Sequence, residues 1–347
     1  MFEKQVVESE FYSPLKDFGM DTQPIEYRKD PLFSTWCRIN VKRTERVKQW
    51  KSDADFWELV EKSKKGCFFC PENIERTTPK FTPNIATKGR LKHGETHVFP
   101  NLFPFAQYHA IATVTEAHFA DLYEFTRRQI EDTLTASIDF FKRVLKADEK
   151  AKWPSFNWNH LPPSGASILH PHVQLVVDRR PTYVNDSLIK ASARYFQSHG
   201  RNFWADLISE ETRNGERLIG RRNGIAWMAT FAPMGNNEVT AVFEGTSSLD
   251  LTYEQIRSFA TDLRRILKGY YELGIRSFNL TTYSAPFGEE REDFFANVKI
   301  ISRPPPLRDY TSDAGFMETL HMERVVENMP EKLAENLRLF FGVKGSS

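Results

Sequence analysis

The sequence predicts an α+β fold built from two similar halves, in which antiparallel sheets are covered by long helices. Three observations support this prediction: strand-like segments rich in aromatic and β-branched residues, two long segments with apolar residues at helical spacing, and repetition of this order along the chain. The 347 residues, 40% of them hydrophobic, suffice for a large core divided between two domains.

In the first half, the strands are expected on both sides of a long helix. "STWCRINV", "THVFPNLFPF" and "YHAIATVT" predict strands, and a helix of about thirty residues is expected from residue 118 onward. "SFNWNHLPPSGASILHPHVQLVVD" then predicts two strands around a turn rich in proline, glycine and serine. The polar residues 1–30 predict an irregular arm ahead of these elements.

The second half repeats this order. "GIAWMATFAPMGNNEVTAVF" predicts strands, "LTYEQIRSFATDLRRILKGYYELG" a long amphipathic helix, and the segment from "RSFNL" to "IISRP" a strand, a turn and a strand. "SFNW" at 155–158 and "SFNL" at 277–280 both follow a long helix, 122 residues apart. We infer an internal duplication of a strand–strand–helix–strand–strand unit.

The expected division of the chain follows from the duplication. It comprises an arm (1–30), a first domain (31–182), a mainly helical connection (183–222) and a second, supportive domain (223–347). Only the first domain carries the histidine cluster described below, because "NVKII" stands at the matching place in the second.

Composition excludes several classes of protein. The 47 basic and 46 acidic residues give a net charge of +1, which argues against a nucleic-acid-coating protein and against a polybasic membrane binder. No apolar run reaches the roughly 18 to 20 residues of a membrane span, and the charged N-terminal segment does not resemble a signal peptide. Three cysteines do not form a disulfide framework. A cytoplasmic protein is therefore expected.

Cys67 and Cys70 form a C-x-x-C motif in "KKGCFFCPENI". Two thiolates at this spacing can reach one metal ion, whereas a redox pair usually opens a helix and "CFFCPENI" predicts a turn. Metal binding is favoured over redox chemistry and over simple packing. Two further ligands, expected to be histidines, must then come from elsewhere in the chain.

"HPHVQ" places three polar side chains on one face of a predicted strand, because successive side chains of a strand alternate between faces. These are His170, His172 and Gln174, and burying all three without partners would be costly. The nearby turn "NHLPPSGAS" exposes backbone N–H groups and a serine hydroxyl that could cradle a phosphate. Arg43 and Arg46 follow a strand directly, and either belong to a site or form a solvated surface.

Together these segments resemble the galactose-1-phosphate uridylyltransferase family of the histidine-triad superfamily. The resemblance covers most of the chain and includes the arginine pair, "CFFC", "PNLFPFAQYHAIATVTEAHFADL" and, most specifically, "NHLPPSGASILHPHVQ". It implies a fold of two histidine-triad-like halves, of which only the first carries a nucleophile. It also implies a homodimer.

The resemblance implies a role for each matching residue. Zinc would be held by Cys67, Cys70, His118 and His170 in a closed structural site. His172 would attack the α-phosphorus of a nucleotide, and Gln174 would hydrogen-bond the phosphoryl group. The remaining substrate-binding residues would be Arg43, Arg46, Asn101, Phe103, Asn159 and Ser167.

Several positions depart from the family pattern. A second metal site of the family, a glutamate and three histidines, would align with Leu188, Ser284, Lys299 and Ile301, so its absence is expected. Gly315 and His321 stand where the family offers a lysine and a glutamate to the hexose phosphate, and Val173 replaces a glycine. These departures leave the identity of the sugar and of the base open.

The resulting hypothesis is a nucleotidyltransferase that moves a nucleoside monophosphate between a nucleoside diphosphate hexose and a sugar 1-phosphate through a nucleotidyl-histidine intermediate. A phosphorylase that uses inorganic phosphate, acting on an ADP-sugar or a dinucleotide, is an alternative within the same chemistry. A zinc-stabilised nucleotide-binding protein without turnover is a third possibility, from a different class.

Overall fold

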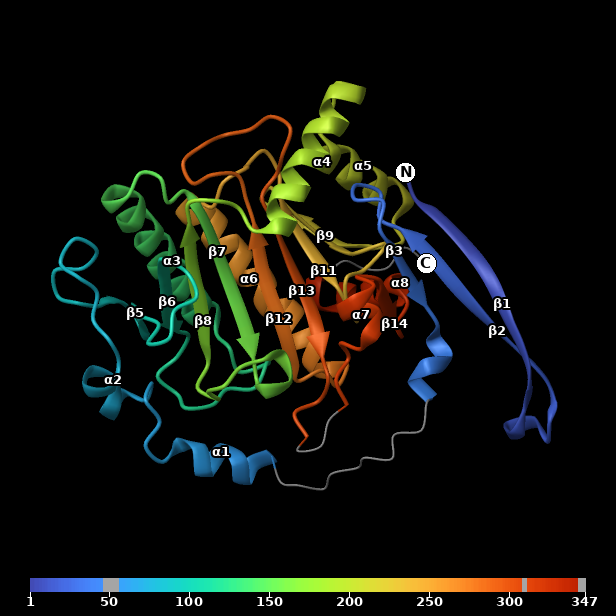
Figure 1. Ribbon diagram of the computed structural model, residues 1–347, viewed down its shortest axis with the longest axis horizontal. Helices are drawn as coiled ribbons and strands as arrows, with labels where there is room; N and C mark the ends of the chain where they lie inside the picture. Colours follow the sequence, from blue (N-terminus) through green and yellow to red (C-terminus); the bar gives the residue numbers. More distant parts are fainter. Residues whose placement is uncertain (46–55, 308–310, 343–347) are drawn as a thin grey trace.

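The computed structural model describes residues 1–45, 56–307 and 311–342, and the chain forms two sheets (Figure 1). The larger sheet has ten strands in the order β4-β5-β6-β8-β7-β12-β13-β11-β10-β9. In chain order these are β4 (Leu91–His93), β5 (Thr96–Pro100), β6 (Tyr108–Thr113), β7 (Trp153–His160), β8 (His172–Asp178), β9 (Leu218–Arg222), β10 (Ile225–Ala229), β11 (Val239–Phe243), β12 (Ser277–Tyr283) and β13 (Asn297–Arg303).

All neighbouring strands of this sheet are antiparallel, and its two halves mirror each other about the pairing of β7 with β12. The predicted α+β fold class, with antiparallel sheets, long helices and two similar halves, is therefore confirmed. Both halves contribute to one continuous sheet, and β9, from the end of the expected helical connection, forms its edge.

The pairing of β7 with β12, here called the seam, carries two related side-chain contacts. Asn279 Nδ2 donates to Asn159 Oδ1 at 2.7 Å, and Thr281 Oγ1 donates to Asn157 Oδ1 at 2.6 Å. Adding the repeat length of 122 to 157 and 159 gives 279 and 281. The duplication therefore relates one contact to the other across the seam.

Two long helices cover one face of the large sheet. They are α3 (Arg127–Ala147) and α6 (Tyr253–Glu272), which contact each other, and α8 (Pro330–Phe341) extends this layer beyond α6. Each long helix begins with a capping box, Thr126 with Gln129 in α3 and Thr252 with Gln255 in α6. The first helix was expected from residue 118 and instead begins at Arg127, because Thr126 caps it.

Different elements cover the opposite face of the sheet in the two halves. In the second half, the helices α4 (Tyr183–His199) and α5 (Phe203–Asn214) bring Leu188 and Trp204 against Ala226 and Met228 of β10.

In the first half, the segment of the cysteine pair packs Phe69 against Phe99 of β5 and Ile111 of β6. Polar side chains of β6 and β8, among them Gln174, lie on this same face. The helical connection thus covers the second copy, and the cysteine-pair segment covers part of the first.

The smaller sheet has the order β1-β2-β3-β14 and includes the N-terminal segment. Its strands are β1 (Glu3–Ser13), β2 (Gly19–Lys29), β3 (Trp36–Ile39) and β14 (Arg324–Val326). The expectation of an irregular arm was wrong, because β1 and β2 pair over eleven residues as a hairpin that projects from the body (Figure 1). At its base the buried Arg28 pairs with Glu331 at 2.9 Å.

The remaining elements are short. They are α1 (Phe56–Lys64), α2 (Pro71–Thr77), α7 (Phe316–Leu320) and three 3₁₀ segments, Pro14–Lys16, Val41–Glu45 and Pro162–Ser164. Within the described ranges, no helix combines the length and the apolar character that crossing a membrane demands.

Phe278 lies at the seam with its side chain fully buried, its ring centroid 5.2 Å from that of Trp158 and stacked on His160. The substitution Phe278→Ala should lower the free energy of unfolding by about 3 to 5 kcal/mol, because it leaves a cavity between the halves. Urea denaturation followed by tryptophan fluorescence measures this change. Phe316→Ala, at an exposed position, is the control; equal effects of the two substitutions would contradict the central role of the seam.

Candidate active site

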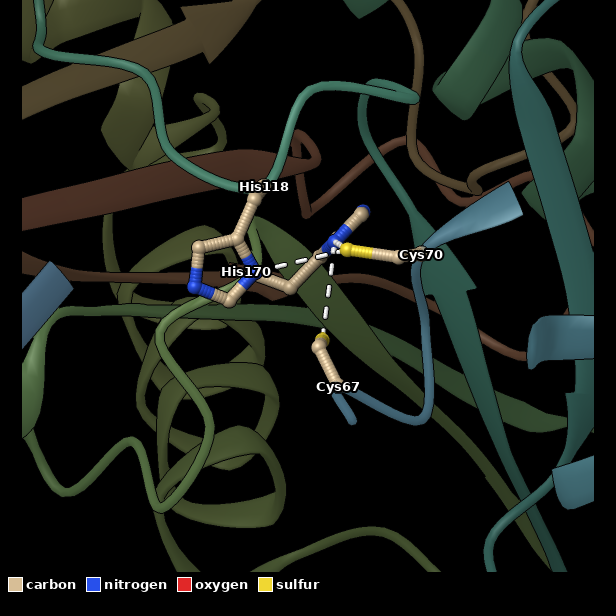
Figure 2. Close-up of side chains that lie close together, drawn as sticks. All are labelled: Cys67, Cys70, His118 and His170. Carbon is tan, nitrogen blue, oxygen red and sulfur yellow. Dashed lines mark hydrogen bonds between the residues drawn. The ribbon is translucent and has the colours of Figure 1, made fainter. Parts of the chain in front are cut away.

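Four potential metal ligands converge beside β8 from three separate segments (Figure 2). Cys67 and Cys70 lie between α1 and α2, His118 in the loop after β6, and His170 just before β8. All four residues are buried, and one donor atom from each lies within 4.8 Å of the others. The predicted ligand set is thus brought together in space.

Both histidines present Nδ1 to the cluster because Nε2 is engaged elsewhere. His170 Nε2 donates to the carbonyl oxygen of Thr115 at 2.8 Å. His118 Nε2 lies 2.9 Å from Ser63 Oγ, whose own proton is donated to Val60 O, so His118 is the donor in that bond. Such outer contacts fix the tautomer that a metal ligand requires.

The donor atoms fit a tetrahedral metal site. Cys70 Sγ lies 3.4 Å from His118 Nδ1 and 3.6 Å from His170 Nδ1, and Cys67 Sγ lies 3.9 Å from His170 Nδ1. Bond lengths of about 2.3 Å to sulfur and 2.1 Å to nitrogen in a tetrahedron separate these atoms by roughly 3.6 Å. Burial raises the pKa of the Cys70 thiol to about 12, so a nearby cation would be needed to stabilise its thiolate near pH 7.

The segment after the cysteine pair was expected to be a turn, and this expectation was wrong. The helix α2 begins at Pro71, directly after Cys70, which serves as its N-cap. Proline at the first helical position needs no hydrogen-bonded N–H, which is why a helix can start there. The convergence of two histidines on both thiols still distinguishes this cluster from a redox pair, which needs no such ligands.

His172 begins β8, two residues after His170 and on the same face of the strand. Its Nδ1–H donates to the carbonyl oxygen of His170 at 2.7 Å, which leaves the proton-free Nε2 as a lone-pair donor. Burial lowers the pKa of His172, so the ring is neutral near pH 7. The ring of Phe69, between the two cysteines, packs edge-on at 5.3 Å from it. The metal cluster thus positions this imidazole from both sides.

A tight turn between β7 and β8 lies next to His172. Gly165 has φ +93°, a conformation that favours glycine, and a side chain placed there would approach Asn159 Nδ2 at 3.7 Å. Asn159 is anchored through Asn279, which also donates to Ser164 O at 2.8 Å. Ser167 follows in the exposed part of the turn. The turn thus offers small residues and an exposed hydroxyl, and the amide of Asn159 on β7 is anchored beside it.

Comparison with known proteins agrees with this geometry. No family model matches the chain. An Archaeoglobus fulgidus protein described as uncharacterized is 30% identical over 314 residues, which cover 90% of this chain and 92% of that protein, so the two belong to one family. An Arabidopsis thaliana ADP-glucose phosphorylase with bound ADP-glucose shares the fold at a TM-score of 0.69, with 17% identity over 90% of this chain and 98% of that one.

Two further structures share the same architecture. A GalT-like protein from Arabidopsis thaliana aligns with a TM-score of 0.68 and 17% identity, covering 90% of this chain and 98% of that one. A uridylyltransferase aligns with a TM-score of 0.66 and 18% identity, covering 90% and 97%. The chain therefore shares the fold of the uridylyltransferase and ADP-glucose phosphorylase structures. At these identities the likeness to the solved structures establishes the fold alone.

The loop after β5 contains two of the predicted substrate-binding residues. The ring of Phe103 is 83% exposed, and Asn101 Oδ1 accepts a hydrogen bond from the Phe103 N–H at 2.9 Å. His109 connects this loop to the site, because its Nε2 lies 2.9 Å from Gln174 Oε1 and 3.2 Å from Asn101 Nδ2. Sequence reasoning did not single out His109. In "YHAIATVT" it stands two residues before Ile111, on the same face of the strand, and Ile111 pairs with Gln174.

Arg43 lies elsewhere than beside His172. It lines an open cavity of about 570 Å³ together with Arg276 and Arg303, at the end of β13 and near the C-terminal segment. Neither His172 nor Gln174 lines this cavity within the described part of the chain. Arg46, its predicted companion, falls outside the described residues.

The second half carries other chemistry at the place that corresponds to the nucleophile. β8 pairs with β7 in the first half as β13 pairs with β12 in the second. In these equivalent pairings, Lys299 on β13 occupies the position that His172 occupies on β8. Its Nζ donates to Glu238 Oε1 at 2.6 Å in a buried ion pair. Leu188 packs in the adjacent apolar cluster, and Ser284 is buried. The second half thus holds an internal cation where the first half holds an imidazole.

Substitution of one of the four ligands should release the bound metal ion. Cys70→Ser should lower the metal content of the purified protein from about one ion per chain to a small fraction, because a closed four-ligand site loses one of its thiolates. Plasma mass spectrometry measures the content. Cys37→Ser, a buried thiol outside the cluster, should retain the ion. Unchanged metal content in Cys70→Ser would contradict the assignment.

Proposed function

We propose that the protein is a nucleotidyltransferase that carries a nucleoside monophosphate on His172 between two phosphate-bearing substrates. The observation that supports this function best is the hydrogen bond from His172 Nδ1 to the carbonyl oxygen of His170, which leaves Nε2 as a neutral nucleophile. An imidazole in this state attacks phosphorus near pH 7 without an activating base.

In the first step, His172 Nε2 attacks the α-phosphorus of a nucleoside diphosphate hexose. The N–P bond forms while the bond from the α-phosphorus to the bridging oxygen breaks, and hexose 1-phosphate leaves. In the second step, a phosphate oxygen of the acceptor attacks the same phosphorus, the N–P bond breaks and neutral His172 is restored. The two steps use one pocket in turn and predict ping-pong kinetics.

The residues around His172 supply donors for the non-bridging oxygens. Gln174 stands two residues further along the same face, Asn159 lies on the neighbouring strand β7, and Ser167 belongs to the turn that follows β7. Donors fixed in advance around developing charge are a main source of such catalysis. In this proposal Asn101 and Phe103 lie against ribose and base.

The ion of the Cys67–His170 cluster is proposed to be zinc, because thiolates and imidazole nitrogens in a tetrahedron are its preferred donors. When bound, zinc would supply structural rigidity, since the four protein ligands leave no open position for a substrate. Its contribution is to hold the strand that carries His172. Pro171, between ligand and nucleophile, limits the freedom of that link by fixing φ.

The acceptor is proposed to be a sugar 1-phosphate, as in the galactose-1-phosphate uridylyltransferases. The cavity lined by Arg43, Arg276 and Arg303, and also by Asp313, Glu318 and Glu327, is proposed to hold its phosphate in a homodimer in which the cavity faces the His172 of a second copy. Gel filtration with light scattering tests the homodimer; a monomer at micromolar concentration would exclude this arrangement.

Inorganic phosphate is the alternative acceptor, which would make the protein a phosphorylase. Residues 313–321, "DAGFMETLH", contain no lysine or arginine, so the segment that would hold a hexose phosphate has no permanent cation of its own. Arg303 is engaged by Asp313 and Asn279. These observations are the reason to keep inorganic phosphate as the alternative acceptor, and either acceptor leaves nucleotidyl transfer to His172 unchanged.

His172→Asn should abolish formation of a nucleotidyl adduct, because the amide has no nucleophilic lone pair on nitrogen. Intact-protein mass spectrometry after incubation with UDP-glucose and with ADP-glucose measures the adduct directly. We expect an adduct of the wild-type protein with at least one of the two donors.

His199→Asn, at an exposed helix end, is the matched control and should form the adduct as the wild type does. An adduct that persists in His172→Asn would refute His172 as the nucleophile. Tight nucleotide binding without an adduct in the wild type would favour the non-catalytic, nucleotide-binding alternative.

The acceptor is identified as the compound that removes the nucleotide from His172 in the isolated adduct. Incubation of the wild-type adduct with inorganic phosphate or with hexose 1-phosphate should remove the nucleotide at rates that differ by at least about 100-fold, because each acceptor needs a matching pocket. Release of nucleoside diphosphate indicates a phosphorylase, and release of a nucleotide sugar indicates the hexose-1-phosphate reaction.

A further inference from the structure

His109 is a buried histidine on β6, one strand away from the proposed nucleophile. The register pairs Ile111 with Gln174 and His109 with Val176, so His109 and Gln174 are diagonal neighbours on the same face. The Nε2 atom of His109 lies 2.9 Å from Gln174 Oε1. No step of the proposed reaction uses His109, so the contact calls for a separate explanation.

The surrounding hydrogen bonds determine which ring nitrogen of His109 carries the proton. The backbone N–H of Phe105 points at Nδ1 from 3.4 Å, so Nδ1 is the acceptor and the proton lies on Nε2. Nε2–H therefore donates to Gln174 Oε1. The opposite tautomer would satisfy only Asn101 Nδ2, 3.2 Å away, and would set two N–H groups against each other at Nδ1.

This tautomer orients the amide of Gln174. An amide has one acceptor and one donor end, so a bond at Oε1 turns the NH₂ group away from His109. Among the described residues no hydrogen bond to Gln174 Nε2 is found, and His172 is its same-face neighbour. The NH₂ group is thus available to donate to a phosphoryl oxygen at the nucleophile.

We propose that His109 is a positioning residue, which fixes the Gln174 amide with its NH₂ group toward the transferred phosphoryl group. The inference rests on the proposed nucleotidyl transfer and extends it by one residue. Without the Nε2–H donor, the Gln174 amide can flip and present its oxygen to a phosphate, which repels it.

His109 also links the phosphoryl site to the loop of residues 101–105. Its ring lies 4.1 Å from the exposed ring of Phe105, and the Phe105 N–H is the group that sets its tautomer. A base that orders this loop would therefore favour the productive orientation of Gln174. Through this contact, the base bound at the loop would influence the orientation of Gln174, and thereby the rate of the reaction at phosphorus.

The first test compares His109→Leu with His109→Gln in single-turnover adduct formation from ADP-glucose or UDP-glucose, whichever labels the wild type. Leucine should lower the rate at saturating donor by about 10- to 100-fold, the usual cost of losing an orienting partner. Glutamine, whose amide can donate from near the Nε2 position, should restore the rate to within about threefold. The donor concentration at half-maximal rate should change little.

A double-mutant cycle separates positioning from a general structural effect. Gln174→Leu should itself slow adduct formation, and adding His109→Leu should cause little further loss, because both act through one amide. Multiplicative losses, or failure of His109→Gln to rescue, would overturn the inference. His93→Leu, on the edge strand β4, is the matched control and should keep the wild-type rate.

A spectroscopic test does not depend on turnover. Long-range ¹H–¹⁵N spectra of the nucleotide-free protein should show His109 as the Nε2–H tautomer, with a changed Nε2 shift in Gln174→Leu. The Nδ1–H tautomer would overturn the inference. A wild-type protein that forms no adduct, but shows the expected tautomer and coupling, would instead refute the proposed function alone.

Discussion

The candidate site depends on the antiparallel pairing of β8 with β6 on one side and with β7 on the other. This register sets Gln174 opposite both Ile111 and Asn157 and brings His109, His172 and the turn at Asn159 onto one face. A shift of one residue would turn His172 and Gln174 into the helix-covered core, because side chains alternate between faces. The buried Val173 and Leu175, on the other face, hold the register by packing under α3.

Two kinds of constraint act on the imidazole of His172. The backbone carbonyl of His170 fixes its tautomer, while the ligand cluster, through His170 and Phe69, fixes its place. The second half contributes at a distance, because Asn279 at the seam anchors both Asn159 and the turn at Ser164. The duplication thus gave a first half that carries the proposed nucleophile and a second half that supports it. In the second half, α4 and α5 cover the sheet face that corresponds to the candidate site.

The pattern of the sequence predicted the duplicated fold, and the family resemblance implied His118 and His170 as partners of the cysteine pair. The predictions failed where tertiary contacts decided the outcome. The N-terminal hairpin was missed because polar, alternating residues such as those of β1 resemble an irregular arm. The predicted start of the first long helix lay too early in the sequence, because apolar residues at helical spacing also precede Thr126. Thr126 caps the helix and sets its first residue. His109 was missed because a single histidine in a strand carries no signal until Gln174 lies beside it.

By itself the sequence determined the elements, their repetition and the chemical types at the site: two thiols, histidines separated by two residues, and a small-residue turn. These follow from local periodicity and spacing. Only the tertiary structure decided that His118 and His170 turn Nδ1 inward, that Arg43 lies in a separate cavity, and that Lys299 fills the place of the nucleophile in the second half. The reason is physical. The tautomer of His170 depends on a hydrogen-bond partner 55 residues away, and the cavity of Arg43 is completed by residues from the C-terminal half of the chain, which no local pattern encodes.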